Sequence, residues 1–264
     1  MTWQEAYLSR YYNPRSGFID GTSQFHSLCE KHIPPRSKIL EIGAGPTNQT
    51  SKFLSQIGEL HGVDIDPDVS ANSALRTTNR IENDHYPFLD HSFDACVSNY
   101  VLEHVEYPDA HLAEVKRVLK PGGTYVFRTP NRYHYVAIIS SHTPLWFHRL
   151  IANRLRNLPR DAHDPYPTFY RFNDERKMTA AAKQIGMEIV EFHLVEKEPS
   201  YGMSSRLMFL LLMGYERTVN FSEKLRSFRS NILAVFKTPE EQKLDKFTMP
   251  TSTAGYSNET PIIK

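Results

Sequence analysis

Short apolar runs alternate with stretches of helical spacing over residues 38–130. The runs have the length of strands and are KILEIG (38–43), LHGVDI (60–65), SFDACVSNY (92–100) and TYVFRTP (124–130). Between them, TSKFLSQI (50–57) and AHLAEVKRVLK (110–120) are predicted helices, and the second ends at PGG, which stops a helix. Strands that alternate with helices of this length predict a parallel sheet covered on both faces.

The pattern changes after residue 130. Residues 131–172 are rich in histidine and proline and show no sustained period, so we expect an insertion with short helices. ERKMTAAAKQIG (175–186) predicts a helix and MEIVEFHLVE (187–196) a strand. A second stretch, 197–228, is predicted to be irregular, and NILAVFK (231–237) is predicted to be the last strand, antiparallel to the one before it.

A glycine-containing turn follows the first predicted strand, in EIGAGPTNQT (41–50). Gly43 and Gly45 allow the backbone to turn sharply and to approach a ligand closely, and the amides that begin the next helix can face an anion. The third glycine of a dinucleotide-binding turn is replaced by Asn48, and the Gly-Lys-Ser/Thr of a P-loop is missing. The turn therefore indicates a nucleotide-like ligand without identifying it.

An acidic residue ends the second predicted strand. Asp64 lies 21 residues after Gly43, where a carboxylate can accept both hydroxyl groups of a ribose. The alternative role of a helix cap suits Asp66, which precedes Pro67, better than it suits Asp64. Together the two motifs indicate a bound adenosine.

Five motifs follow one another between residues 41 and 131. They are the E-x-G-x-G turn, the acidic end of the second strand, YPFLDHSFD (86–94), LEH (102–104) and RVLKPGG (117–123). In this order they closely resemble the class I S-adenosylmethionine-dependent methyltransferases, in the subgroup that includes quinone-biosynthesis and small-molecule enzymes. The resemblance covers the core and not the two insertions.

The resemblance implies an α/β fold with a Rossmann-like sheet of seven strands, mostly parallel with the last strand antiparallel. We expect one domain over residues 1–238 and a polar tail at 239–264. The insertions at 131–172 and 197–228 are expected to act as substrate lids.

The resemblance also implies roles for residues of the glycine turn and the second strand. Glu41, Gly43 and Gly45 match the loop that holds the methionyl end of S-adenosylmethionine. Asp64 matches the acid that binds the ribose, and Ile65 would lie beside the adenine.

Two further cofactor contacts follow from the family pattern. Glu82 or Asn83, in IENDHY (81–86), would face the adenine amino group, although the usual Gly-Asp-Ala is absent there. Asn99 and Tyr100, after the fourth strand, would lie under the sulfonium, where an aromatic face favours a cation. For Tyr100 a role in the core is the alternative.

Methyl transfer from a sulfonium is a displacement on an activated carbon, so the protein mainly positions the two reactants. A hydroxyl acceptor also needs a base to take its proton. His104, in LEHV, and His134, in TPNRYHY after the fifth strand, are the two candidate bases, because loops at the carboxyl ends of the strands form the crevice in such sheets. A histidine held by backbone hydrogen bonds is the alternative for His104.

A metal site needs the same residues. Some members of the class bind a divalent ion through E-x-x-E-H and a later histidine, which would be Glu103, His104 and His134 here. The first glutamate of that motif is replaced by Tyr100, and a site with one carboxylate suits a hard cation poorly. We therefore predict no metal.

The 131–172 insertion is expected to choose the substrate. DAHDPYPTFYRFN (161–173) combines aromatic and cationic side chains with two prolines. The candidate acceptor contacts are Tyr133, Tyr166, Tyr170 and Arg171. Arg171 could hold a carboxylate or phosphate, or it could form an ordinary surface salt bridge.

Composition excludes several other classes of protein. The net charge of +1 gives no field that would hold nucleic acid or an anionic membrane. Cys29 and Cys96 lie far apart in the sequence, which predicts neither a disulfide framework nor a zinc ribbon and fits a cytoplasmic setting. The N-terminus has no signal-peptide pattern. The longest apolar run, 207–213, is too short to span a bilayer, so we expect a core helix or an apolar wall of a substrate pocket there.

We therefore expect a methyltransferase that uses S-adenosylmethionine, acts on a small molecule and is a monomer or homodimer. The expected reaction is O-methylation of a sugar, a glycan intermediate or a secondary metabolite. N- or C-methylation stays open, as does a lipid-linked acceptor, which the run at 207–213 would suit. A catalytically silent partner subunit and a dinucleotide-dependent oxidoreductase are the alternatives from other classes.

Overall fold

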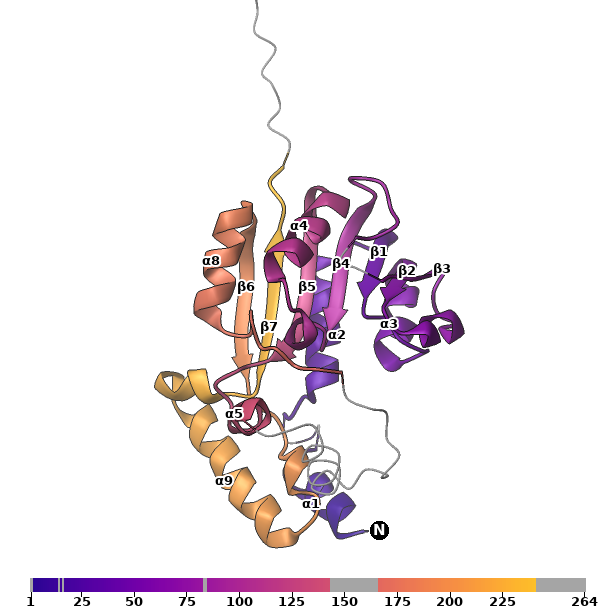
Figure 1. The fold of residues 1–264 in the computed structure, drawn as a ribbon. Coiled ribbons are helices and arrows are strands. Elements are labelled where there is room, and N and C mark those ends of the chain that lie inside the picture. The colour runs from indigo at the N-terminus through magenta and orange to yellow at the C-terminus, as the bar shows by residue number, and fades with distance from the viewer. Residues whose placement is uncertain (1, 14, 16, 83–84, 143–165, 241–264) are drawn as a thin grey trace, which may run out of the picture.

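A twisted sheet forms the centre of the protein (Figure 1). The computed structural model describes residues 2–13, 15, 17–82, 85–142 and 166–240. In this part of the chain the sheet has seven strands, in the order β3-β2-β1-β4-β5-β7-β6. The strands are β1 (Ser37–Ile42), β2 (Gly58–Asp64), β3 (Thr77–Arg80), β4 (Phe93–Asn99), β5 (Leu119–Pro130), β6 (Glu188–Val195) and β7 (Asn231–Lys237).

The pairing of the strands follows the predicted fold class. β1 pairs in parallel with β2 and β4, β2 with β3, and β4 with β5. β7 lies between β5 and β6 and is antiparallel to both. The Rossmann-like, mostly parallel sheet with an antiparallel last strand is thus confirmed.

Helices cover both faces of the sheet (Figure 1). α2 (Gly21–His32) and α3 (Gln49–Ile57) bury Phe25 and Leu54 on one face, against strand residues that include Ile39 and Val126. α4 (Pro108–Val118) and α8 (Glu175–Ile185) bury Leu112 and Met178 on the other face, in the cluster that contains Phe127 and Phe236. Because both faces are covered, the inner strands are nearly continuous apolar runs.

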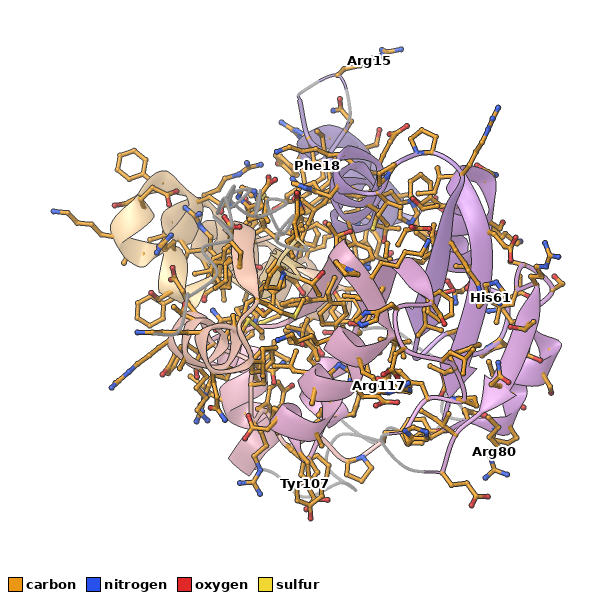
Figure 2. All side chains as sticks on the ribbon, turned by 90° about the horizontal axis from the view of Figure 1, so that it is seen from above. Arg15, Phe18, His61, Arg80, Tyr107 and Arg117 are labelled. Carbon is orange, nitrogen blue, oxygen red and sulfur yellow. The ribbon has the colours of Figure 1, made fainter. Side chains whose placement is uncertain are left out.

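The remaining helices lie beyond the carboxyl ends of the parallel strands (Figure 1). They are α1 (Trp3–Tyr11), α5 (Tyr135–His142) and α9 (Arg206–Phe221). Short 3-10 turns complete the described chain: η2 (Pro67–Ala71), η3 (Leu102–His104), η5 (Ser200–Gly202) and η6 (Glu223–Phe228). The β3 edge, marked by Arg80 in Figure 2, and α9 lie on opposite sides of the molecule.

The expectation that residues 197–228 are irregular is wrong. They contain the 16-residue helix α9, whose N-cap Ser205 accepts a hydrogen bond from the amide of Met208 at 3.1 Å. The apolar run at 207–213 belongs to α9, where Phe209 is fully buried and Leu207 is 69% exposed. No helix among the described residues is long and apolar enough to cross a membrane.

One further strand was not predicted from the sequence, and part of the predicted insertion lies outside the described residues. β3 was not predicted, because its sequence TTNR is polar and it is an edge strand with little burial. Of the 131–172 insertion, the structure describes α5 and residues 166–172, and residues 143–165 lie outside the described part. The tail beyond residue 240 also lies outside it, and the division into one domain and a tail stays a prediction.

Candidate functional site

The turn after β1 depends on glycine. Gly43 has a φ of +69° and Gly45 a φ of +52°, a region that side chains rarely adopt. A Cβ on Gly43 would lie 2.3 Å from Cγ2 of Val101, so a larger residue would require Val101 to move. Asn48, at the place of the missing third glycine, caps α3 by accepting hydrogen bonds from the amides of Thr50 (2.8 Å) and Ser51 (3.0 Å).

Asp64 connects the end of β2 to this turn. Its carboxylate accepts hydrogen bonds from the amide of Gly45 at 2.7 Å and from the amide of Asp66 at 2.8 Å, one on each oxygen. Each oxygen keeps a further lone pair for a ligand. Asp66 caps η2 through the amide of Asp68, as the sequence predicted, and Ile65 is 50% exposed.

Glu41 is a buried acid beneath the turn. It is 3% exposed, and its Oε2 atom is buried without a hydrogen-bond partner in the described chain. Burial raises the pKa of Glu41 to about 7, a shift that Ser51 opposes and Asp64 adds to. A buried acceptor without a donor suits a ligand that brings a cationic donor, such as an ammonium group.

Asn99 and Tyr100 follow β4 at the same edge of the sheet. The side-chain amide of Asn99 donates to Oγ1 of Thr50 at 3.2 Å, and its oxygen accepts from Nε of Arg128 at 2.8 Å. Tyr100 has a φ of +61°, is 42% exposed and donates its hydroxyl to Asn231 at 2.9 Å. Tyr100 is therefore exposed at this edge rather than buried in the core.

The structure gives less support to the two candidate contacts of the adenine amino group, Glu82 and Asn83. Glu82 is exposed in the loop after β3, and Asn83 lies outside the described residues. Glu82 forms no hydrogen bond in the described chain that fixes it near the end of β3.

His104 lies in η3 with one ring nitrogen occupied. Its Nδ1 lies 2.8 Å from the carbonyl oxygen of Pro167, to which it donates, so the neutral ring carries its lone pair on Nε2. Burial lowers the pKa of His104, and the Pro167 carbonyl partly opposes this shift. The Nε2 atom is 4.0 Å from Oε1 of Glu103, too far for a hydrogen bond. His104 is thus a neutral base with a lone pair that no hydrogen bond occupies in the described chain.

Glu103 fixes the neighbouring segment. Its carbonyl oxygen accepts the amides of Phe169 at 2.7 Å and Tyr170 at 3.2 Å, and its side chain accepts the hydroxyl of Thr129 at 3.1 Å. Burial raises the pKa of this carboxyl group to about 7. Residues 166–170 are therefore held against η3.

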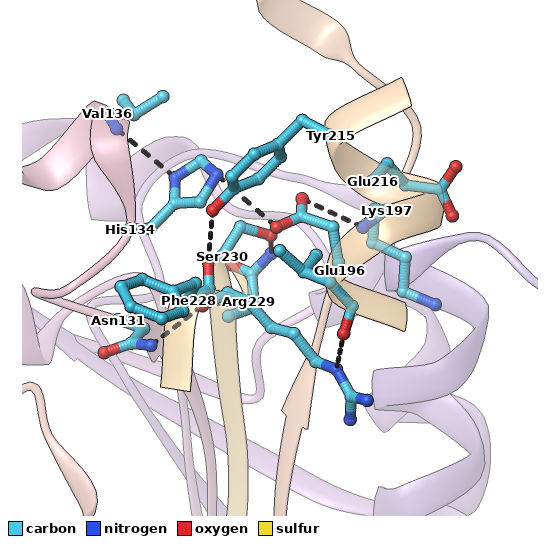
Figure 3. Close-up of polar contacts among 12 residues, drawn as sticks. Asn131, His134, Val136, Glu196, Lys197, Tyr215, Glu216, Phe228, Arg229 and Ser230 are labelled. Atoms are coloured by element: carbon cyan, nitrogen blue, oxygen red, sulfur yellow. Dashed lines mark hydrogen bonds and ion pairs between the residues drawn. The ribbon is translucent and has the colours of Figure 1, made fainter. Parts of the chain in front are cut away.

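His134 follows β5 and is enclosed. Its Nδ1 accepts the amide of Val136 at 3.4 Å, and its Nε2 lies 3.4 Å from Oε2 of Glu196, which Figure 3 shows facing it. Burial lowers the pKa of His134 to about 4 and raises that of Glu196 to about 7, so burial disfavours the charged form of both groups. The ring packs against Tyr135 and Tyr215. Both ring nitrogens therefore face protein atoms.

The four candidate acceptor contacts are dispersed. Tyr166 lies beside His104, with ring centroids 6.1 Å apart, and donates its hydroxyl to Asp66 at 2.7 Å. Tyr170 follows in the same segment with a φ of +48°. Tyr133 is 49% exposed beneath Arg132, and Arg171 is exposed. Only Tyr166 and Tyr170 are thus brought to η3.

One residue of the crevice was missed from the sequence. Arg128, in β5, is 5% exposed and lies over the rings of Phe25 (5.2 Å) and Tyr100 (4.6 Å). A single arginine inside the apolar run TYVFRTP was the available sign. As for metals, no group of three or more His, Cys, Asp or Glu side chains in the described chain could hold an ion.

Comparisons with known proteins agree with this geometry. Residues 40–127 match the family model described as a methyltransferase domain. The demethylmenaquinone methyltransferase of Tropheryma whipplei is 34% identical over 106 residues, which are 36% of this chain and 44% of that protein. The chain spans less than half the length of the curated relatives it matches.

Solved structures share the fold at low identity. The [4+2]-cyclase SpnF has a TM-score of 0.52 at 15% identity, with 82% of this chain and 81% of that chain covered. The phosphoethanolamine N-methyltransferase 2 of Haemonchus contortus, solved with S-adenosyl-L-methionine, has a TM-score of 0.51 at 15% identity, with 82% and 52% covered. The match over residues 40–127 identifies this segment as a methyltransferase domain, and the strand order and the glycine turn of the structure agree with that match.

Proposed function

We propose that the protein transfers a methyl group from S-adenosylmethionine to a small molecule, and that the acceptor atom is an oxygen. The observation that carries the proposal is the edge formed by β1 and β2, where the turn at Gly43 and Gly45 meets the carboxylate of Asp64. The same edge has the buried, unpartnered oxygen of Glu41.

The residues at this edge fit S-adenosylmethionine. Asp64 has lone pairs for the two ribose hydroxyls, and Ile65 offers an exposed apolar surface for the adenine. Oε2 of Glu41 would accept the ammonium of the methionyl group. Asn99 and Tyr100 would lie near the sulfonium, and Glu82 and Asn83 remain the candidates for the adenine amino group. When bound, the cofactor supplies a methyl group on a positively charged sulfur.

His104 is the better candidate for the base. Its Nε2 lone pair is available in the described chain, and its lowered pKa keeps it unprotonated at neutral pH. It would take the proton of an acceptor hydroxyl, with Glu103 too far away to compete. His134 is the second candidate, but its two nitrogens face Val136 and Glu196.

The acceptor would lie between η3 and the 166–170 segment. Tyr166 and Tyr170 belong to this segment, so we propose them as the first acceptor contacts, with Tyr133 and Arg171 further out. A sugar, a glycan intermediate or a secondary metabolite has the hydroxyl that a histidine base requires. A nitrogen acceptor or a carbon acceptor is an outcome of the acceptor screen rather than part of the proposal.

Calorimetry with S-adenosylmethionine and S-adenosylhomocysteine tests the cofactor. We expect binding by the wild type and a loss of about a hundredfold or more in Asp64→Ala, since two charge-assisted hydrogen bonds to the ribose disappear. Asp68→Ala removes an exposed acid of η2 and is the matched control. No binding by the wild type would reject the proposal, and binding of a nicotinamide dinucleotide instead would favour an oxidoreductase.

A further inference from the structure

Arg128 is a buried cation without an ion pair. It is 5% exposed, and no described carboxylate oxygen lies within 4.0 Å of its guanidinium nitrogens. Buried charges in proteins are normally paired, because the loss of hydration is otherwise uncompensated. The pairing of β5 in the sheet does not explain why a charged side chain is buried at residue 128.

The guanidinium is held so that one end stays open. Nε donates to the side-chain oxygen of Asn99 at 2.8 Å, and the rings of Phe25 and Tyr100 enclose the group at 5.2 Å and 4.6 Å. The two terminal nitrogens, Nη1 and Nη2, donate to no acceptor in the described chain. A planar guanidinium fixed by Nε and by two rings presents these nitrogens side by side.

The charges around Arg128 do not replace a partner. Glu103 and Glu198 act on it only from beyond ion-pair distance, and burial raises the pKa of both carboxyl groups, which weakens their charge. Lys197, a second cation, adds repulsion. Asp20 is occupied by the N-terminus of α2, where it accepts the amides of Thr22 and Ser23 and the hydroxyl of Ser23.

The start of α2 leaves room at the open end. A Cβ on Gly21 would lie 3.3 Å from Nη1 of Arg128 and 3.5 Å from Cγ of Lys197, so a side chain would crowd both cations. Lys197 also lines a cavity of about 470 Å³ together with Phe18, Gln24 and Glu216. Gly21 is thus close to both Arg128 and Lys197, and Lys197 reaches the cavity.

We propose that the Nη1 and Nη2 atoms of Arg128 bind an oxyanion, a carboxylate or a phosphate, of a ligand in the crevice. Two parallel N–H donors match two oxygens of such a group. Which ligand supplies it rests on the proposed function: the methionyl carboxylate of the cofactor or an anionic group of the methyl acceptor. In either case the anion compensates a positive charge that would otherwise repel a sulfonium nearby.

Proton–nitrogen NMR of the arginine side chains tests the anion site without the cofactor. The Nε–H signal of Arg128 is assigned by its absence in Arg128→Gln, and the wild type is titrated with acetate and with inorganic phosphate. We expect that signal to shift and saturate, while the signal of Arg76, an exposed arginine paired with Glu59, moves little. No saturable shift with either anion would overturn the proposal.

Calorimetry then separates the two sources. S-adenosylhomocysteine is compared with methylthioadenosine, which keeps the adenosine and the thioether but lacks the amino acid. If Arg128 binds the cofactor carboxylate, Arg128→Gln loses about tenfold to a hundredfold in affinity for S-adenosylhomocysteine only. If it binds the acceptor, Arg128→Gln binds both ligands as the wild type does, and the acetate shift persists in the saturated wild-type complex.

Further variants distinguish a loss of anion binding at Arg128 from a loss of folding, and distinguish the anion site from the proposed function. Arg128→Lys keeps the charge and should retain part of the lost affinity, and Arg76→Gln is the matched control. An equal loss for both ligands in Arg128→Gln, with no recovery in Arg128→Lys, would assign Arg128 to the fold and overturn the proposal. A wild type that binds acetate at Arg128 but no S-adenosylhomocysteine would reject the proposed function and keep the anion site.

Discussion

The carboxyl edge of the sheet has two parts that hold their polar groups in different ways. After β1 and β2, backbone amides hold the carboxylate of Asp64, and the buried acid Glu41 has an oxygen without a partner. After β5 and β6, side chains face one another, as His134 and Glu196 do in Figure 3. The first arrangement leaves atoms available to a ligand. In the second, Nε2 of His134 and Oε2 of Glu196 lie 3.4 Å apart and enclose one another without a hydrogen bond, although both parts contain acids with raised pKa values.

The two histidines give the largest test of this contrast. We expect His104→Ala to lower turnover by about a hundredfold to ten-thousandfold, because a general base contributes that much, and to leave cofactor affinity unchanged. His134→Ala should instead lower the free energy of unfolding by about 2 kcal/mol, since it opens a cavity beside Glu196. Steady-state kinetics and urea unfolding of both variants measure the two effects. If His134→Ala lost the turnover and His104→Ala did not, the two histidines would exchange roles.

The glycine turn gives a test of stability. Gly43→Ala adds a left-handed alanine and a contact with Val101, so we expect a loss of about 2 to 4 kcal/mol in the free energy of unfolding. Gly17 also has a positive φ, +79°, but a Cβ there meets no atom within 4 Å. Gly17→Ala is therefore the matched control for backbone strain alone, at about 1 to 2 kcal/mol. If both variants lost the same free energy of unfolding, the contact with Val101 would add no destabilisation to that of the backbone.

Glu41 gives the smallest effect, on pH dependence. Its pKa of about 7 means that the carboxyl group is mostly protonated below pH 7, and only the carboxylate attracts an ammonium. The affinity for S-adenosylhomocysteine should therefore rise with pH, by up to about tenfold per unit below pH 7, and level off above it. Calorimetry across this range should show a flatter profile for Glu41→Gln. A wild-type profile as flat as that of Glu41→Gln would remove Glu41 from the ammonium site.

The two parts also differ in how far the sequence predicted them. The turn at Gly43 and the cap at Asp66 are local patterns that depend on residues a few positions away, and the acid at Asp64 was found from its spacing of 21 residues after Gly43. The seven-stranded, mostly parallel sheet with an antiparallel last strand followed from the resemblance of the motifs and is confirmed. Turn residues, helix caps and apolar spacing can be recognised in the sequence without knowledge of tertiary contacts.

The other part depends on contacts between distant residues. His134 meets Glu196, and Tyr12 donates its hydroxyl to Glu216 at 3.0 Å across 204 positions. Neither contact has a sequence pattern. Residues 197–228 were predicted to be irregular apart from the apolar run at 207–213, for which a core helix was one possibility. The buried side of α9 forms where Trp3 and Tyr7, near the N-terminus, pack on Phe209. The structure of this segment therefore depends on packing between distant parts of the chain, which the local spacing of apolar residues does not describe.

The hydrogen bond between His104 and Pro167 makes the tautomer of the His104 ring depend on the position of residues 166–170. The carbonyl of Pro167 selects the tautomer, and the amides of Phe169 and Tyr170 hold that carbonyl in place through Glu103. If His104 is the base, any displacement of residues 166–170 that admits an acceptor also releases the ring to turn. Without the Pro167 carbonyl the proton of the neutral ring could lie on either nitrogen, so the position of residues 166–170 decides which ring atom carries the lone pair.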